Sequence, residues 1–115
     1  VVVIINNGYL GMVRQWQELF YGRRYSGVML TQHGRAPNEH IPEAQRYLPD
    51  FVMMAEAHGA CARRISKPEE VAPALAEAFA SRKTWVIECI VSPEANVFPM
   101  IPPGSHVAEM INRTV

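Results

Sequence analysis

The feature that most constrains this chain is the run VVVII over residues 1–5, in which every side chain is β-branched and none is polar. β-Branched residues favour strands. A strand without polar alternation is typical of a parallel sheet whose two faces are both covered. Such a strand needs neighbours on both sides. We therefore expect residues 1–5 to form a central strand, and the 115-residue chain to be the C-terminal piece of a longer protein.

Hydrophobic periodicity predicts that strands and helices alternate along the rest of the chain. The expected order is strand, helix, long loop, helix, strand, helix, strand and tail, and alternation of this kind means right-handed crossovers and a parallel sheet. We expect an α/β fold that is an incomplete part of a doubly wound parallel sheet, in one domain over residues 1–115. The predicted segments are helix 10–21, loop about 27–48, helix 51–58, strand 61–65, a helix carrying Val71, Leu75, Ala78 and Phe79, strand 85–91, and an extended tail about 93–115 with a short helix at 106–111.

Three local signals refine these elements. Ser66 followed by Glu69 predicts a capping box at the start of the third helix. His58, at the end of the second helix, is expected to contact the terminal carbonyl groups. Glu88 lies inside an otherwise apolar strand, so it is expected either to be paired or to lie at the edge of the sheet.

Charge and cysteine content exclude several classes of protein. Eleven basic and eleven acidic residues give no net charge and a pI near 7.1, which removes the electrostatic case for a nucleic-acid partner or an anionic membrane. The longest apolar run is far shorter than the ~20 residues of a membrane span. Cys61 and Cys89 are far apart and form no CxxC motif, which is typical of buried thiols in a reduced, intracellular protein.

The segment after the first strand, Asn6-Asn7-Gly8-Tyr9-Leu10-Gly11, is the candidate binding site. Ligands of open α/β sheets bind at the carboxyl ends of strands. An asparagine oxygen can ligate a hard cation, and glycine lets backbone approach a phosphate. The following helix presents its N-terminus, which favours anions. A magnesium-bridged diphosphate fits this pattern, but so does a plain Asn-Gly turn.

The chain resembles the large catalytic subunit of acetolactate synthase (acetohydroxyacid synthase) over residues 1–111. The most specific motif is the run GMVRQWQ at residues 11–17 after Asn6-Asn7, and the tail NVFPMIPPG at 96–104 is nearly as specific. Further matches follow in order at residues 20–21, 24–26, 49–51, 55–57 and 67–70. The loop between Ser26 and Pro49 is longer than in many members of the family.

The resemblance implies a thiamine diphosphate and Mg2+ site. Asn7 would supply a side-chain oxygen to the metal, and Tyr9 its main-chain carbonyl. Met12 matches the apolar residue on which the bent cofactor rests, and Trp16 the residue that contacts the second 2-ketoacid and favours 2-ketobutyrate over pyruvate. The cofactor-binding residues are then Gly8, Tyr9, Leu10, Gly11 and Met12.

The resemblance also implies a reaction and partners for the full enzyme. It would condense pyruvate with a second 2-ketoacid (pyruvate or 2-ketobutyrate) with loss of CO2, in branched-chain amino acid biosynthesis. Such enzymes carry FAD in another domain, form homodimers or homotetramers and have a regulatory small subunit. They are cytoplasmic, or organellar in eukaryotes. No catalytic residue is expected within this chain, because the Gly-Asp metal ligand and the activating glutamate would lie elsewhere, so the fragment alone should be inactive.

Two alternatives remain open. One is a related thiamine diphosphate-dependent 2-ketoacid lyase or decarboxylase, and the other is a truncated, non-catalytic interaction module.

Without the resemblance, Met12 and Trp16 would be interpreted as core residues, because they lie one helical turn apart. Arg14 and Gln15 could contact a phosphate or face solvent, and we expect them to face solvent.

Overall fold

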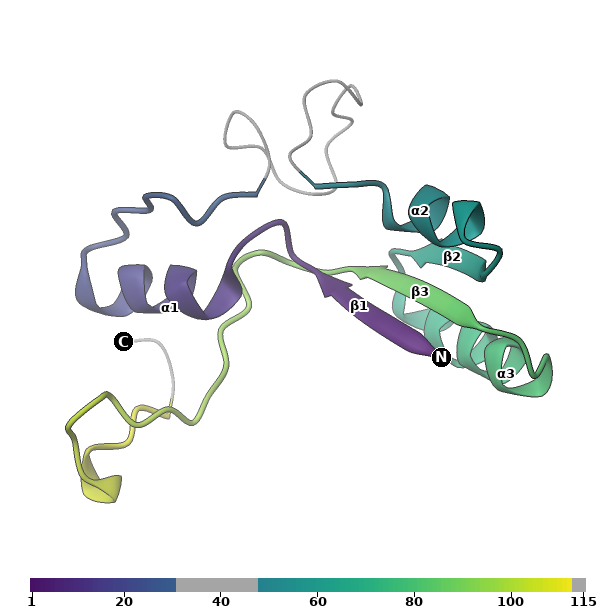
Figure 1. The fold of residues 1–115 in the computed structure, drawn as a ribbon. Coiled ribbons are helices and arrows are strands. Elements are labelled where there is room, and N and C mark those ends of the chain that lie inside the picture. The colour runs from purple at the N-terminus through teal and green to yellow at the C-terminus, as the bar shows by residue number, and fades with distance from the viewer. Residues whose placement is uncertain (31–47, 113–115) are drawn as a thin grey trace.

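The computed structural model of the chain describes residues 1–30 and 48–112. Three parallel strands, β1 (Val2–Asn6), β2 (Cys61–Ile65) and β3 (Trp85–Ile90), form one sheet in the order β1-β3-β2 (Figure 1). The predicted α/β class with a parallel sheet is confirmed. The helices are α1 (Gly11–Phe20), α2 (Phe51–Ala57) and α3 (Val71–Ala80), with short 3₁₀ turns η3 (Pro68–Glu70) and η4 (Val107–Glu109).

The central strand is β3, and not the apolar run at the start of the chain. β3 pairs with β1 on one side and with β2 on the other. β1 is an edge strand among the described residues, and Val2 and Ile5 are 53% and 65% exposed. The expectation of a central strand at residues 1–5 concerns the sheet of a longer protein, so the order of these three strands leaves it a prediction. An apolar pattern reports that a segment favours burial, but strand order depends on which segments pair with it.

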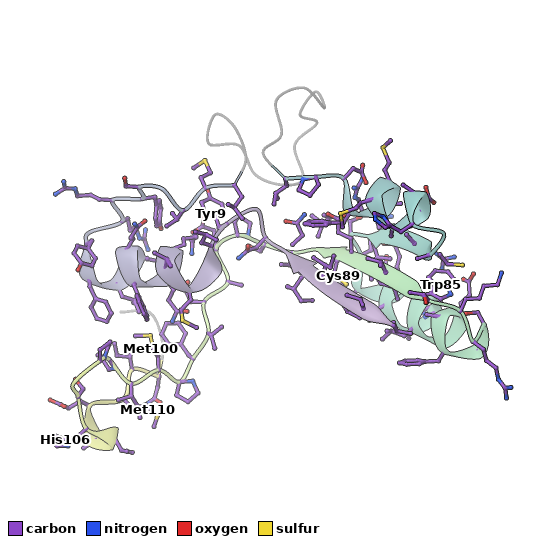
Figure 2. All side chains as sticks on the ribbon, viewed as in Figure 1. Tyr9, Trp85, Cys89, Met100, His106 and Met110 are labelled. Carbon is purple, nitrogen blue, oxygen red and sulfur yellow. The ribbon has the colours of Figure 1, made fainter. Side chains whose placement is uncertain are left out.

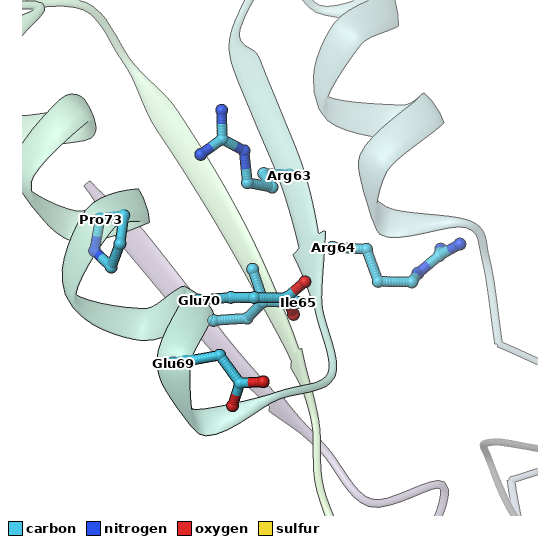
Figure 3. Close-up of a pocket in the computed structure, with 6 residues that line it drawn as sticks. All are labelled: Arg63, Arg64, Ile65, Glu69, Glu70 and Pro73. Atoms are coloured by element: carbon cyan, nitrogen blue, oxygen red, sulfur yellow. The ribbon is translucent and has the colours of Figure 1, made fainter.

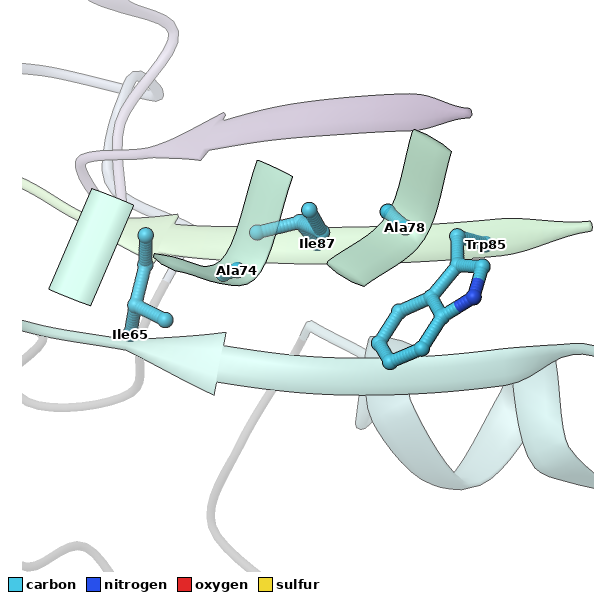
Figure 4. Close-up of a cluster of buried hydrophobic side chains, with 5 residues drawn as sticks. All are labelled: Ile65, Ala74, Ala78, Trp85 and Ile87. Carbon is cyan, nitrogen blue, oxygen red and sulfur yellow. The ribbon is translucent and has the colours of Figure 1, made fainter. Parts of the chain in front are cut away.

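The core lies between the sheet and α3, and α2 packs against the sheet beside β2 and β3. Ala74 and Ala78 of α3 are almost fully buried, and they lie on either side of Ile87 along β3 (Figure 4). Their small side chains let the helix lie close to the strand. The indole nitrogen of Trp85 donates a 2.7 Å hydrogen bond to the Ser81 hydroxyl at the end of α3. The buried cluster consists of Ile65, Ala74, Ala78, Trp85 and Ile87.

A carboxylate caps the start of α2 and another caps the turn before α3, and the second cap differs from the sequence prediction. Asp50 caps α2 by accepting hydrogen bonds from the backbone N–H groups of Val52 (3.0 Å) and Met53 (3.1 Å). Before α3, the predicted capping box at Ser66 and Glu69 is wrong. The 3₁₀ turn η3 precedes that helix, so the carboxylate one residue later, Glu70, accepts from the N–H groups of Ser66 and Lys67.

The segment after β3 continues beyond the sheet, passes the start of α1 and runs below that helix (Figure 1). The Gln15 side chain accepts from the Val97 N–H at 2.9 Å and donates to the Val97 carbonyl at 2.8 Å. Arg14 and Gln15 are only 1% and 4% exposed. The prediction that they face solvent is wrong, because a segment about 80 residues away in the sequence covers them. Near the C-terminus, the predicted helix over 106–111 is only the turn η4.

Other local predictions have mixed outcomes. His58 lies 2.8 Å through Nδ1 from the Met54 carbonyl at the end of α2, as expected. Cys61 and Cys89 are free thiols and half-buried, and burial raises the pKa of Cys89. Most of the predicted loop over residues 27–48 lies outside the described residues. Among the helices that are described, none is both long and apolar enough to cross a membrane.

Candidate functional site

The candidate site is the turn between β1 and α1. The side-chain oxygen of Asn6 accepts a hydrogen bond from the Gly8 N–H, and that of Asn7 accepts one from the Tyr9 N–H, both at 3.0 Å. Gly8 has a φ of 72°, a left-handed conformation that glycine adopts without strain. Two consecutive asparagine turns thus bend the chain sharply at the carboxyl end of β1.

A second segment supports this turn from outside. The Leu10 N–H donates to the Val28 carbonyl at 2.8 Å, and the Leu30 N–H donates to the Gly8 carbonyl at 2.9 Å. Val28 is 2% exposed. Tyr9 therefore lies in a short antiparallel bridge with Met29, beside the start of α1 (Figure 2). Hydrogen bonds to residues 28–30 thus fix the turn on either side of Tyr9.

Gly11, the first residue of α1, lies directly against the Asn7 side chain. A Cβ atom at Gly11 would lie 2.8 Å from Asn7 Nδ2, which is closer than such atoms approach in proteins. Glycine is needed here because the asparagine amide occupies the space of a side chain. Sequence reasoning included Gly11 in the site but gave no such contact for it.

The chemistry of this turn suits a hard cation and an anion together. Side-chain amide and main-chain carbonyl oxygens are ligands that Mg2+ accepts, and an amide oxygen has two lone pairs, so Asn7 can serve a metal while it accepts from Tyr9. No side chain caps the N-terminus of α1, and its first turn has no acidic residue. Residues 1–30 and 48–112 contain no cluster of three His, Cys, Asp or Glu side chains that could hold a metal. The turn therefore fits Mg2+ as part of a ligand set.

Met12 and Trp16 lie on the exposed face of α1. Met12 is 69% exposed and Trp16 is 37% exposed. The interpretation of this pair as core is therefore wrong for the described part of the chain. Both side chains are accessible to a ligand, and their contact with one stays a prediction.

A network of charged groups, which we call the Glu88 network, joins this turn to α2. Glu88 is 2% exposed. Its Oε1 accepts from Asn6 Nδ2 at 2.7 Å, and its Oε2 accepts from Arg64 Nε at 2.6 Å. Arg64 also lies 2.9 Å from the Asp50 carboxylate. Of the two predictions for Glu88, pairing is confirmed, and Glu88 lies in the middle strand.

The pairing also shifts the ionisation of two members of this network. Burial opposes the charge of Asp50, but hydrogen bonds from Met53 and Val52 and the Arg64 guanidinium lower its pKa below the ordinary value. Burial likewise opposes the charge of Arg64, and the Glu88 and Asp50 carboxylates more than offset it, so the pKa of Arg64 is raised. Both groups therefore stay charged at neutral pH.

Arg14 is the second buried ionic centre near the site, and the sequence gave no sign of it. It lies 3.1 Å from Glu18 and also pairs with Glu94, and it donates to Asn96 at 3.2 Å. Its guanidinium lies 5.1 Å from the centre of the Tyr25 ring. Burial raises the pKa of that tyrosine. Arg14 thus holds α1 against the segment that follows β3.

A separate pocket lies between β2 and the start of α3 (Figure 3). Three of its four charged side chains, Arg63, Arg64 and Glu70, have partners within the chain. Arg63 binds Glu77 at 2.7 Å, Arg64 belongs to the Glu88 network, and Glu70 caps the preceding turn. It contains none of the predicted site residues. Its lining is Arg63, Arg64, Ile65, Glu69, Glu70 and Pro73.

Comparisons with known proteins show what the chain is similar to. A family model described as "Thiamine pyrophosphate enzyme, C-terminal TPP binding domain" matches residues 1–89. The acetolactate synthase large subunit of Corynebacterium glutamicum is 44% identical over 110 residues, which are 95% of this chain and 16% of that protein. The probable acetolactate synthase large subunit of Methanocaldococcus jannaschii is 37% identical over 111 residues, 96% of this chain and 16% of its own length. The isozyme 2 large subunit of Escherichia coli is 33% identical over 112 residues, 97% of this chain and 18% of that subunit.

Proposed function

The chain belongs to the thiamine pyrophosphate enzymes, because the model of their C-terminal TPP-binding domain matches residues 1–89. From that premise we propose that residues 1–115 are the C-terminal portion of this domain in an acetolactate synthase catalytic subunit. The support is a sequence identity of 33–44% to acetolactate synthase large subunits over nearly the whole chain. The chain spans only 16–18% of the length of these relatives. The activity of the complete subunit is therefore part of the proposal.

The observation that carries the proposal is the Asn7–Gly11 turn. The Asn7 side-chain oxygen and the Tyr9 main-chain carbonyl would hold Mg2+. The backbone of residues 8–12 would lie against the diphosphate. The uncapped N-terminus of α1 would bind it, because the N–H groups of a first helical turn and the helix dipole attract anions. The contact between Gly11 and Asn7 supports this assignment, since it places the asparagine amide directly against the start of the helix.

The exposed face of α1 would serve the organic part of the site. Met12 would support the bent cofactor, and Trp16, one turn further along, would contact the second 2-ketoacid. When bound, thiamine diphosphate supplies the electron sink that lets a 2-ketoacid lose CO2. The chain's own part is to hold the diphosphate, orient the cofactor and shape the apolar surface for the second substrate.

In this proposal the complete subunit condenses pyruvate with pyruvate or 2-ketobutyrate, a step in branched-chain amino acid biosynthesis. It would bind FAD through a domain outside this chain. It would also form a homodimer or homotetramer and associate with a regulatory small subunit.

The test uses the complete subunit, stripped of cofactors and then supplied with thiamine diphosphate, Mg2+ and pyruvate. We expect it to form acetolactate. Asn7→Ala should raise the Mg2+ concentration for half-maximal activity at least about 10-fold, as loss of metal-site groups does. The matched control Asn112→Ala, at an exposed position, should leave it unchanged.

Two other results would contradict the proposal, and each would indicate a different alternative. Release of a free aldehyde from pyruvate, without acetolactate, would indicate a related 2-ketoacid decarboxylase or lyase. A subunit that binds no thiamine diphosphate would indicate a non-catalytic interaction module.

A further inference from the structure

We propose that Glu88 is a positioning residue that orients the Asn6 side chain and, through it, the Asn7–Tyr9 turn for metal binding. The inference rests on the proposed function above. Neither Glu88 nor Asn6 is proposed to touch the metal.

Asn6 is bound in a single orientation. Its Nδ2 donates to Glu88 Oε1 at 2.7 Å, and its Oδ1 accepts from the Gly8 N–H at 3.0 Å. Its main-chain carbonyl accepts from the Val91 N–H at 3.0 Å. Both oxygens of Glu88 accept hydrogen bonds, one from Asn6 and one from Arg64, so the amino group of Asn6 faces Glu88. The Asn6 oxygen is then directed at Gly8.

Glu88 is itself held in place from its other side. Arg64 Nε donates to Glu88 Oε2 at 2.6 Å, and Arg64 binds Asp50 at 2.9 Å. Asp50 in turn caps α2. A buried carboxylate is costly unless it is paired, and this pairing leaves Glu88 little freedom to turn away from Asn6. The orientation of Asn6 is thus set from the middle of the sheet.

The consequence falls on Gly8 and the residues after it. If Asn6 reversed its amide, the Gly8 N–H would face a donor instead of an acceptor, and the first of the two asparagine turns would open. Asn7 and Tyr9 follow within the same turn. We therefore expect Glu88 to affect metal affinity without contributing a ligand.

Exchange of donors and acceptors provides the test. In Glu88→Gln, the new amide has one acceptor oxygen but faces two donors, Asn6 Nδ2 and Arg64 Nε. Its amino group must therefore face one of these donors, and that hydrogen bond is lost. In Asn6→Asp, two carboxylates face one another. In the double variant, the amide at position 88 can donate to the carboxylate at position 6 and accept from Arg64, while that carboxylate still accepts from Gly8. Every hydrogen bond of the pair is restored with the same net charge.

The measurement is the Mg2+ concentration for half-maximal thiamine diphosphate binding to the complete subunit, by equilibrium dialysis, with thermal unfolding measured in parallel. We expect each single variant to need about 10–100-fold more Mg2+ and the double variant to lie within about 3-fold of wild type. Arg63→Gln is the matched control, because Arg63 precedes Arg64 on β2 and pairs with the exposed Glu77 instead; it should bind as wild type.

Each outcome bears on the proposal. Single variants that bind Mg2+ as wild type does, or a double variant no better than the weaker single variant, would overturn the role of Glu88 alone. If the single variants do not fold, the double variant decides, since the proposal requires it to fold and bind within about 3-fold of wild type. A wild-type subunit that binds no thiamine diphosphate overturns both this inference and the proposed function.

Discussion

Gly11→Ala should separate metal affinity from stability at the candidate site. The added Cβ would lie 2.8 Å from Asn7 Nδ2 and 3.9 Å from its Cγ. The first distance is too short, so one group must move. The Asn7 side chain is the more mobile of the two, because the alternative is a shift of the helix backbone.

The expected change in stability is small because two effects oppose each other. Displacing Asn7 breaks its 3.0 Å hydrogen bond from Tyr9, and such a bond contributes about 0.5–1.5 kcal/mol. Alanine in place of a helical glycine gains up to about 1 kcal/mol. The free energy of unfolding should therefore change by less than about 1 kcal/mol, whereas Mg2+ affinity should fall about 10-fold or more because a ligand is displaced.

The assay is a Mg2+ titration of the complete subunit at saturating thiamine diphosphate, beside its thermal midpoint. The same substitution in an Asn7→Ala background is the control. There the clash is absent, so Gly11→Ala should cause no further loss of affinity. If Gly11→Ala leaves Mg2+ affinity at the wild-type level, Asn7 is only a turn residue and the reasoning fails.

Three further substitutions test other parts of the structure. Arg14→Met removes a charged side chain that is 1% exposed and takes the 3.1 Å partner from the buried Glu18 carboxylate, so hydrogen exchange of α1 should show a loss of about 3–5 kcal/mol in opening free energy; no loss beyond that of the exposed control Lys83→Met would contradict it. Trp16→Leu should lower the preference for 2-ketobutyrate by about 1–3 kcal/mol, read from product ratios in competition with pyruvate, and unchanged ratios would refute the contact. The pKa of Asp50 is lowered from 3.8, so its contribution to stability is present above that pH and is lost as the pH falls through the folded value. The thermal midpoint of Asp50→Asn should then lie below wild type at neutral pH and converge with it only as the pH falls below 3.8 and through the lowered folded pKa; a difference that persists in stronger acid would show that the charge is not responsible.

The sequence by itself determined the features that depend on neighbouring residues. Apolar runs and helical periodicity identified the three strands and the three helices, because burial and propensity act within a few residues. The asparagine turn was also readable, since the two hydrogen bonds that close it lie within residues 6–9. The candidate metal ligands, Asn7 and Tyr9, therefore came from the sequence and its resemblance to a family.

Only the tertiary structure decided the features that join distant segments. Arg14 is polar and lies on a surface helix, yet it is buried by residues about 80 positions away. Glu88 was ambiguous until β3 took the centre of the sheet and brought Asn6 and Arg64 to opposite oxygens of its carboxylate. No local pattern encodes these pairings, because strand order and loop return are set by the packing of the whole sheet. Sequence thus identified the binding turn, and tertiary structure showed what holds it in place.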